Sequence, residues 1–170
     1  MPSVAIAIFP GVQALDVAGP LDVFAEANLF IDGKDRYEVA LLAADSEPLR
    51  ASNGIRLVAD ETFDQQRSTF DLALIAGGPA LPESTPDARL TAWLANVASQ
   101  CERYGSICTG AFALGHAGLL DDRNVTLDHG KITAIDAGAD VAASPGTTVI
   151  DLRGRTVMPG LVGKIGRAHV

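Results

Sequence analysis

Short, continuous runs of apolar residues recur along roughly the first 127 positions of the chain, and polar or glycine-rich turns close them. These runs cover residues 4–9, 39–44, 72–76 and, in a shorter form, 104–107. A strand has a continuous apolar sequence when crossover helices bury both of its faces. The pattern therefore predicts strands of a central, two-sided sheet.

Segments with helical spacing lie between these runs. The clearest is residues 86–101, whose apolar positions fall on one helical stripe: Leu90, Trp93, Leu94, Val97 and Cys101. On this stripe Cys101 is predicted to be a packed core thiol. An earlier helix is expected to start near Pro20, after a loop over residues 12–19, because proline suits a first helical turn. A small-residue helix is expected over residues 109–115.

A hairpin is predicted within residues 49–60, where short polar and apolar alternations flank Asn53-Gly54. The remaining strands and helices alternate, which favours an α/β fold with a doubly wound, mostly parallel sheet of the flavodoxin-like kind. Ligands of such sheets bind at the carboxyl ends of the strands. Asp16, Gly77, Gly78 and Cys108 all follow predicted strands, so three loops bring polar groups to one edge.

Composition limits the classes of function. The chain has 170 residues and 48% hydrophobic content, which is enough for one core plus an appendage. Its net charge of −8 gives no broad attraction to nucleic acid or anionic lipid, so this chain alone is not expected to bind DNA or a membrane. No apolar stretch reaches the roughly 18 to 20 residues of a membrane span. Met1 leads directly into a strand without a signal-peptide pattern, and a chain with two cysteines fits a reducing, cytoplasmic setting.

Cys108 is the candidate reactive residue. At the junction of a strand and a helix, a thiol meets backbone N–H groups and the positive end of the helix dipole, which favour the thiolate. The functional interpretation is a nucleophile or an oxidation-sensitive thiolate; the alternative is a small buried core residue.

Three other positions carry paired interpretations. Asp16 is either a helix N-terminal cap or a general acid/base for the thiol. Thr109 either holds an oxyanion or starts the helix. Gly77 and Gly78 either donate backbone N–H groups to a ligand or developing negative charge, or only form a tight turn.

The histidines do not support a Cys-His-acid protease. A cysteine hydrolase needs a base near its nucleophile, and the neighbour of Cys108 is Thr109. His116 lies well inside the predicted helix and is expected to pack or to face solvent. His129 and His169 lie in the C-terminal appendage.

Three motifs together resemble the ThiJ/PfpI superfamily, which has the class I glutamine-amidotransferase-like fold. They are DVAGPLDV at residues 16–23, IAGG at 75–78 and SICTGAFALG at 106–115. The resemblance covers residues 4–127. Residues 106–120 are similar to the sensor domain of AraC-type transcriptional regulators, in which a DNA-binding half normally follows. Isocyanide hydratase is similar in the same places.

The resemblance to isocyanide hydratase implies that Cys108 attacks the carbon of an isocyanide substrate. Asp16 and Thr109 would assist protonation and water addition. It implies no cofactor. A dimer is plausible from the same resemblance, with a small molecule as ligand or substrate.

Beyond residue 127 the resemblance changes. Residues 128–163 are similar to the opening β segment of an amidohydrolase, but the Asp and His-x-His that would bind its metal are missing after residue 161. One terminal histidine is too few ligands, so no metal site is predicted. Residues 164–170 are interpreted as a non-native tail, and the chain as a possible chimera.

Three hypotheses follow. The first is the small-molecule or redox sensing domain of an AraC-type regulator without its DNA-binding half. The second is a hydratase with a cysteine nucleophile. The third is a non-functional fusion fragment, which predicts poorly cooperative unfolding.

Overall fold

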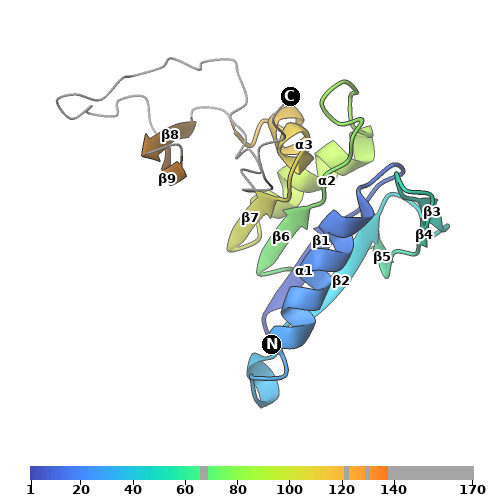
Figure 1. The fold of residues 1–170 in the computed structure, drawn as a ribbon, viewed down its shortest axis with the longest axis vertical. Coiled ribbons are helices and arrows are strands. Elements are labelled where there is room, and N and C mark those ends of the chain that lie inside the picture. Colours follow the sequence, from blue (N-terminus) through green and yellow to red (C-terminus); the bar gives the residue numbers. More distant parts are fainter. Residues whose placement is uncertain (66–68, 121–122, 129–130, 138–170) are drawn as a thin grey trace, which may run out of the picture. The chain divides into compact units, whose positions relative to one another are not determined.

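The computed structural model describes residues 1–65, 69–120, 123–128 and 131–137 (Figure 1). The chain forms two compact units, Met1–Leu119 and Leu120–Val170. In the described part of the second unit, β8 (Arg123–Asp128) pairs antiparallel with β9 (Lys131–Ala137). The predicted limits at residues 127, 128–163 and 164–170 lie largely outside the described residues and stay predictions.

A five-stranded sheet forms the centre of the first unit, in the order β5-β2-β1-β6-β7. Every neighbouring pair in this sheet is parallel. The prediction of an α/β fold with a mostly parallel sheet is confirmed. The strands are β1 (Ser3–Ala7), β2 (Glu38–Ala43), β5 (Glu61–Thr62), β6 (Leu72–Ile75) and β7 (Arg103–Ser106).

The strand order indicates where this kind of sheet would bind a ligand. From β1 the chain proceeds to β2 on one side, and later to β6 and β7 on the other. The carboxyl ends of β1 and β6 therefore flank the point where the winding reverses, which is where open α/β sheets bind ligands. Val4, Ile6 and Ile8, from β1 and the residues just after it, are fully buried, so this edge of the sheet adjoins the core of the unit.

Helix α1 (Ala14–Ala27) begins earlier than the sequence predicted and lies along β1 and β2 (Figure 1). The expected loop over residues 12–19 was wrong, because Ala14 and Val17 are buried and extend the apolar face of the helix back by two turns. Pro20 lies inside the helix instead of in its first turn. Since proline has no N–H, the carbonyl of Asp16 lacks its usual helical donor.

Helix α2 (Ala88–Ala98) confirms the predicted stripe. Its buried residues are Leu90, Trp93, Leu94 and Val97. The Asp87 side chain caps it by accepting a hydrogen bond of 2.7 Å from the backbone N–H of Arg89. Cys101 lies beyond the end of the helix and is only partly buried, whereas the sequence predicted a fully packed core thiol. That burial still raises the pKa of its thiol.

The predicted hairpin is confirmed. Strand β3 (Leu49–Arg50) pairs antiparallel with β4 (Arg56–Leu57). Gly54 has a φ of 92°, a left-handed conformation that glycine adopts without strain. Two further short helices complete the described part of the first unit, the 3-10 helix η1 (Gly33–Asp35) and α3 (Gly110–His116).

Candidate functional site

Cys108 lies in a sharp turn between β7 and α3. Its φ is +51°, and it is the one non-glycine residue with positive φ in the part of the chain that the structure describes. A left-handed cysteine costs about 1–3 kcal/mol, which the surrounding structure must offset. Two backbone bonds fix the turn, from Ile107 N to Ile75 O at 2.9 Å and from Gly110 N to Ile107 O at 3.0 Å. The turn leaves the Cys108 residue exposed.

Gly110 lets this turn approach the end of β6. A Cβ atom at Gly110 would overlap the carbonyl oxygen of Ile75 and lie 3.1 Å from that of Ala76. Both obstacles are backbone, which cannot move aside as a flexible side chain can. The glycine two residues after Cys108 is therefore a packing requirement of the turn.

Asp16 reaches the same place from the first turn of α1. Its Oδ2 atom accepts a hydrogen bond of 3.1 Å from the backbone N–H of Gly77, and the residue is half-buried. The N-cap position of α1 belongs to Gln13, so the capping interpretation of Asp16 was wrong. The backbone N–H of Gln13 donates to the carbonyl of Gly77 at 2.7 Å. The start of α1 is thus bonded to both polar backbone groups of Gly77.

The Thr109 side chain likewise forms hydrogen bonds with both polar backbone groups of Gly78. Its Oγ1 accepts from Gly78 N at 2.9 Å and donates to Gly78 O at 2.8 Å. Thr109 is the N-cap of α3, yet its hydroxyl makes no capping bond. The side chain therefore connects the turn of Cys108 to the loop after β6 and does not cap α3.

These contacts converge on one point beside Gly77. A Cβ atom there would overlap Asp16 Oδ2 and would lie 2.9 Å from both the backbone nitrogen and the Oγ1 of Thr109. A Cβ atom at Gly78 would lie 2.9 Å from the Phe9 ring and 3.0 Å from the Gly11 carbonyl. The structure therefore brings Asp16, the two glycines and Thr109 together, and Cys108 is bonded directly to Thr109.

The N–H groups of Gly77 and Gly78 are already used inside the protein. One donates to Asp16 and the other to Thr109. In this conformation they position these side chains. Their predicted role as donors to a ligand stays a prediction, and it would require one of these bonds to be exchanged.

Sequence reasoning missed Gln13 and Ser52. The Ser52 hydroxyl donates to Gln13 Oε1 at 2.8 Å, and Ser52 N donates to Val12 O at 2.9 Å. These bonds connect the hairpin to the residue that holds Gly77. Neither position belongs to a motif, and contacts across 39 residues leave no local signal.

The histidines are not among the residues that the described contacts bring together. His116 is exposed in the last turn of α3, whereas His129 and His169 lie outside the described residues. Among the residues that the structure describes, no group of three or more His, Cys, Asp or Glu side chains comes together as a metal site. Within those same residues, no helix has the length and apolar character to cross a membrane.

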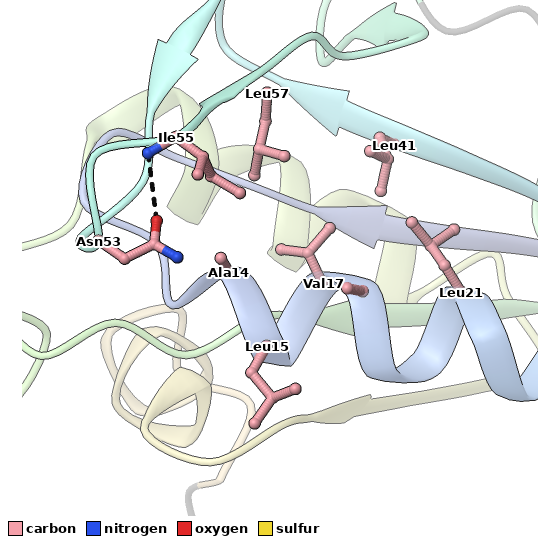
Figure 2. Close-up of a pocket in the computed structure, with 9 residues that line it drawn as sticks. Ala14, Leu15, Val17, Leu21, Leu41, Asn53, Ile55 and Leu57 are labelled. Carbon is pink, nitrogen blue, oxygen red and sulfur yellow. Dashed lines mark hydrogen bonds between the residues drawn. The ribbon is translucent and has the colours of Figure 1, made fainter.

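A separate apolar groove of about 310 Å³ lies between α1 and the β3–β4 hairpin (Figure 2). None of the predicted site residues lines it. Its lining residues are Ala14, Leu15, Val17, Ala18, Leu21, Leu41, Asn53, Ile55 and Leu57. Asn53 is the one polar side chain among these nine.

The sequence profile of the DJ-1/PfpI family matches residues 2–154 of the chain. The chain belongs to the DJ-1/PfpI family. This confirms the resemblance drawn from the three motifs. The match also extends beyond residue 127, through most of residues 128–163, the segment that resembles the opening of an amidohydrolase.

Curated relatives include members of the two groups that the motifs indicated. The isonitrile hydratase of Pseudomonas putida is 31% identical over 119 residues, covering 70% of this chain and 49% of the relative. The HTH-type transcriptional regulator CdhR of Pseudomonas aeruginosa is 29% identical over 160 residues, covering 85% of this chain and 46% of the relative. A protein in the cpoL 5′ region of Streptomyces lividans is 41% identical, covering 72% of this chain and 84% of the relative. The chain thus spans about half the length of the hydratase and of the regulator.

Solved structures of the family share the fold. A ThiJ/PfpI family protein from Pseudomonas syringae has a TM-score of 0.61 at 23% identity, covering 71% of this chain and 47% of the other. An AraC family transcriptional regulator from Pseudomonas putida has a TM-score of 0.57 at 25% identity, covering 72% of this chain and 64% of the other. This DJ-1/PfpI domain is therefore related to both the regulators and the hydratase.

Proposed function

We propose that this DJ-1/PfpI domain is the small-molecule or redox sensing domain of an AraC-type transcriptional regulator, with Cys108 as the responding thiol. One observation carries the proposal: an exposed thiol is held in a left-handed turn while the neighbouring Gly77 and Gly78 N–H groups are occupied internally. Turnover through an anionic intermediate needs free, preorganised donors. A site whose donors are occupied suits binding or a single reversible modification better.

The regulator relatives support this assignment by their coverage. The alignment with CdhR covers 85% of this chain, and that with the HTH-type transcriptional regulator GbdR covers 98%. Each covers slightly less than half of the regulator. The net charge of −8 also leaves DNA binding to another part of such a regulator.

Redox sensing has a direct test on the two cysteines. Hydrogen peroxide would convert the Cys108 thiol to a sulfenic acid, with sulfur oxidised and one peroxide molecule reduced to water and a hydroxyl group on sulfur. Dimedone labelling followed by peptide mass spectrometry reports the site, and dithiothreitol should restore the thiol. We expect Cys108 to be labelled much faster than Cys101. Equal labelling of the two cysteines would count against a role of this domain in sensing peroxide.

Isocyanide hydration is a second candidate, favoured by the assembly of Asp16 and Thr109 around the turn of Cys108. The thiol would add across the isocyanide carbon to form a thioimidate, with its proton transferred to that carbon. Water would then add, the carbon–sulfur bond would break, and N-substituted formamide would leave with the thiol regenerated. Asp16 would be the group that moves protons in both steps.

Cyclohexyl isocyanide separates the two candidates. A hydratase forms many molecules of N-cyclohexylformamide per chain, and the reaction stops in Cys108→Ser. A sensing domain forms none, although its Cys108 remains reactive toward peroxide. A chain whose thermal unfolding is broad, and whose two cysteines behave alike, would support neither function and would favour the fusion-fragment hypothesis.

A further inference from the structure

The Asn53-Gly54 pair has a chemical property that is separate from its role in the hairpin turn. Both residues are exposed in the loop between β3 and β4. An asparagine amide carbon can be attacked by the backbone nitrogen of the following residue, and glycine, without a side chain, hinders this attack least. Whether the reaction proceeds in a folded chain depends on how the loop holds the two groups.

The loop holds the Asn53 side chain in a favourable arrangement. Asn53 Oδ1 accepts a hydrogen bond of 3.2 Å from the backbone N–H of Ile55 (Figure 2). This bond closes a ring that contains both the amide carbon of Asn53 and the nitrogen of Gly54. Negative charge develops on Oδ1 when the nitrogen adds to the amide carbon, and a donor already placed there stabilises it.

A cation also contacts the residue that carries the attacking nitrogen. Arg50 Nη1 donates to the carbonyl of Gly54 at 2.9 Å and lies 3.9 Å from the position of a Cβ atom on Gly54. The Gly54 nitrogen must lose its proton to attack, and a nearby positive charge stabilises the resulting anion. The opposing contact is a backbone bond from Gly54 N to Ala51 O at 2.9 Å, which must open first.

We propose that Asn53 is a site of spontaneous deamidation in the folded protein. The Gly54 nitrogen gives its proton to water and forms a bond to the side-chain amide carbon of Asn53. The bond from that carbon to Nδ2 then breaks, and ammonia leaves with a proton from water. Water opens the resulting five-membered imide at one of its two carbonyls, which gives aspartate or isoaspartate without any change of oxidation state.

Two other asparagines are internal controls. Asn28 uses both ends of its amide, because Nδ2 donates to Tyr37 O at 2.9 Å and Oδ1 accepts from Tyr37 N at 2.7 Å. Asn96 lies inside α2, and its Oδ1 accepts from Gln100 Nε2 at 3.0 Å. Larger residues follow both, namely Leu29 and Val97. The same chemistry is therefore hindered at these positions.

The modification would change the apolar groove. Asn53 contributes its one polar lining side chain, and Figure 2 shows the amide nitrogen directed away from Ile55 and toward α1. Either product places a negative charge there. Isoaspartate also adds a methylene to the backbone within a loop that Ala51 N closes by donating to Ile55 O at 2.9 Å, so this product would loosen the hairpin.

Peptide mapping of the intact chain after incubation in mildly alkaline buffer tests the proposal, with isoaspartate detection and a urea-denatured sample alongside. We expect Asn53 to be converted several-fold faster than Asn28 and Asn96 in the native chain. Asn53→Gln should show no conversion at that position, since glutamine would need a larger ring. An unconverted Asn53 in the native chain, or conversion no faster than at Asn28 and Asn96, would overturn the proposal whatever the denatured sample shows.

Discussion

The carboxylate of Asp16 accepts a hydrogen bond from the backbone N–H of Gly77, 61 positions further along the chain. This contact joins the first turn of α1 to the loop that follows β6. Thr109 joins the same loop to the turn of Cys108 through Gly78. The site therefore consists of three segments at the carboxyl edge of the sheet that side-chain hydrogen bonds hold together. Each of these hydrogen bonds can be tested by substitution.

Substitution of Gly77 should disrupt the site, because a Cβ atom there would overlap Asp16 Oδ2 and crowd Thr109. Overpacking of this kind costs about 1–3 kcal/mol. Urea unfolding should show Gly77→Ala to be destabilised by that amount, with slower alkylation of Cys108.

Gly105→Ala is the matched control for Gly77→Ala. Gly105 lies in β7, and a Cβ atom there would lie 3.6 Å from Leu74 Cδ2, an ordinary contact with a flexible side chain. Alanine in place of a strand glycine should raise the free energy of unfolding by about 0.5–1 kcal/mol. Equal destabilisation by the two substitutions would contradict the described packing at Gly77.

Removal of the Thr109 hydroxyl should lower the free energy of unfolding by more than the partial exposure of this residue suggests. Thr109→Val keeps the shape of the side chain but leaves the buried N–H of Gly78 without its acceptor, a loss of about 1–3 kcal/mol. Thr109→Ser keeps the hydroxyl and should recover most of this stability. Thermal or urea unfolding measures both, and a serine variant as unstable as the valine variant would argue against the two hydrogen bonds.

Two substitutions of Asp16 should separate its structural role from its role in proton transfer. Asp16→Ala removes the acceptor of the Gly77 N–H and should lower the free energy of unfolding by about 1–3 kcal/mol. Asp16→Asn keeps an acceptor oxygen and should unfold close to the parent chain. If the domain hydrates isocyanides, the asparagine variant should nevertheless lose most formamide formation, because it lacks the ionisable group. Formamide formation at the parent rate would exclude Asp16 as the proton-transfer group.

The sequence predicted four of the five strands of the central sheet and the turn of Cys108, because these depend on local patterns, whereas the two-residue β5 has no apolar run and was missed. The buried strands are continuous apolar runs, and Cys108 stands where an apolar run gives way to small residues of a helix. The start of α1 was misplaced because Pro20 signals a helix start locally, whereas burial of Ala14 and Val17 decides the actual boundary.

The site was predictable as a set of residues and unpredictable as a set of bonds. That Asp16, Gly77 and Cys108 meet follows from the carboxyl ends of parallel strands sharing one edge. That the glycine N–H groups are donors to Asp16 and Thr109 depends on side-chain positions across 61 and 31 residues, which no sequence pattern encodes. The participation of Gln13 and Ser52 was hidden for the same reason.

The central claim, that the fold presents Cys108 as a reactive thiol, is tested most directly by the rate of iodoacetamide alkylation at each cysteine, read by peptide mass spectrometry in native and urea-denatured chain. Cys108 is exposed, whereas burial raises the pKa of the Cys101 thiol and leaves less thiolate there. We predict that native Cys108 reacts faster than native Cys101 and faster than Cys108 in the denatured chain. Equal rates for both cysteines, or a native Cys108 slower than the denatured one, would contradict the account.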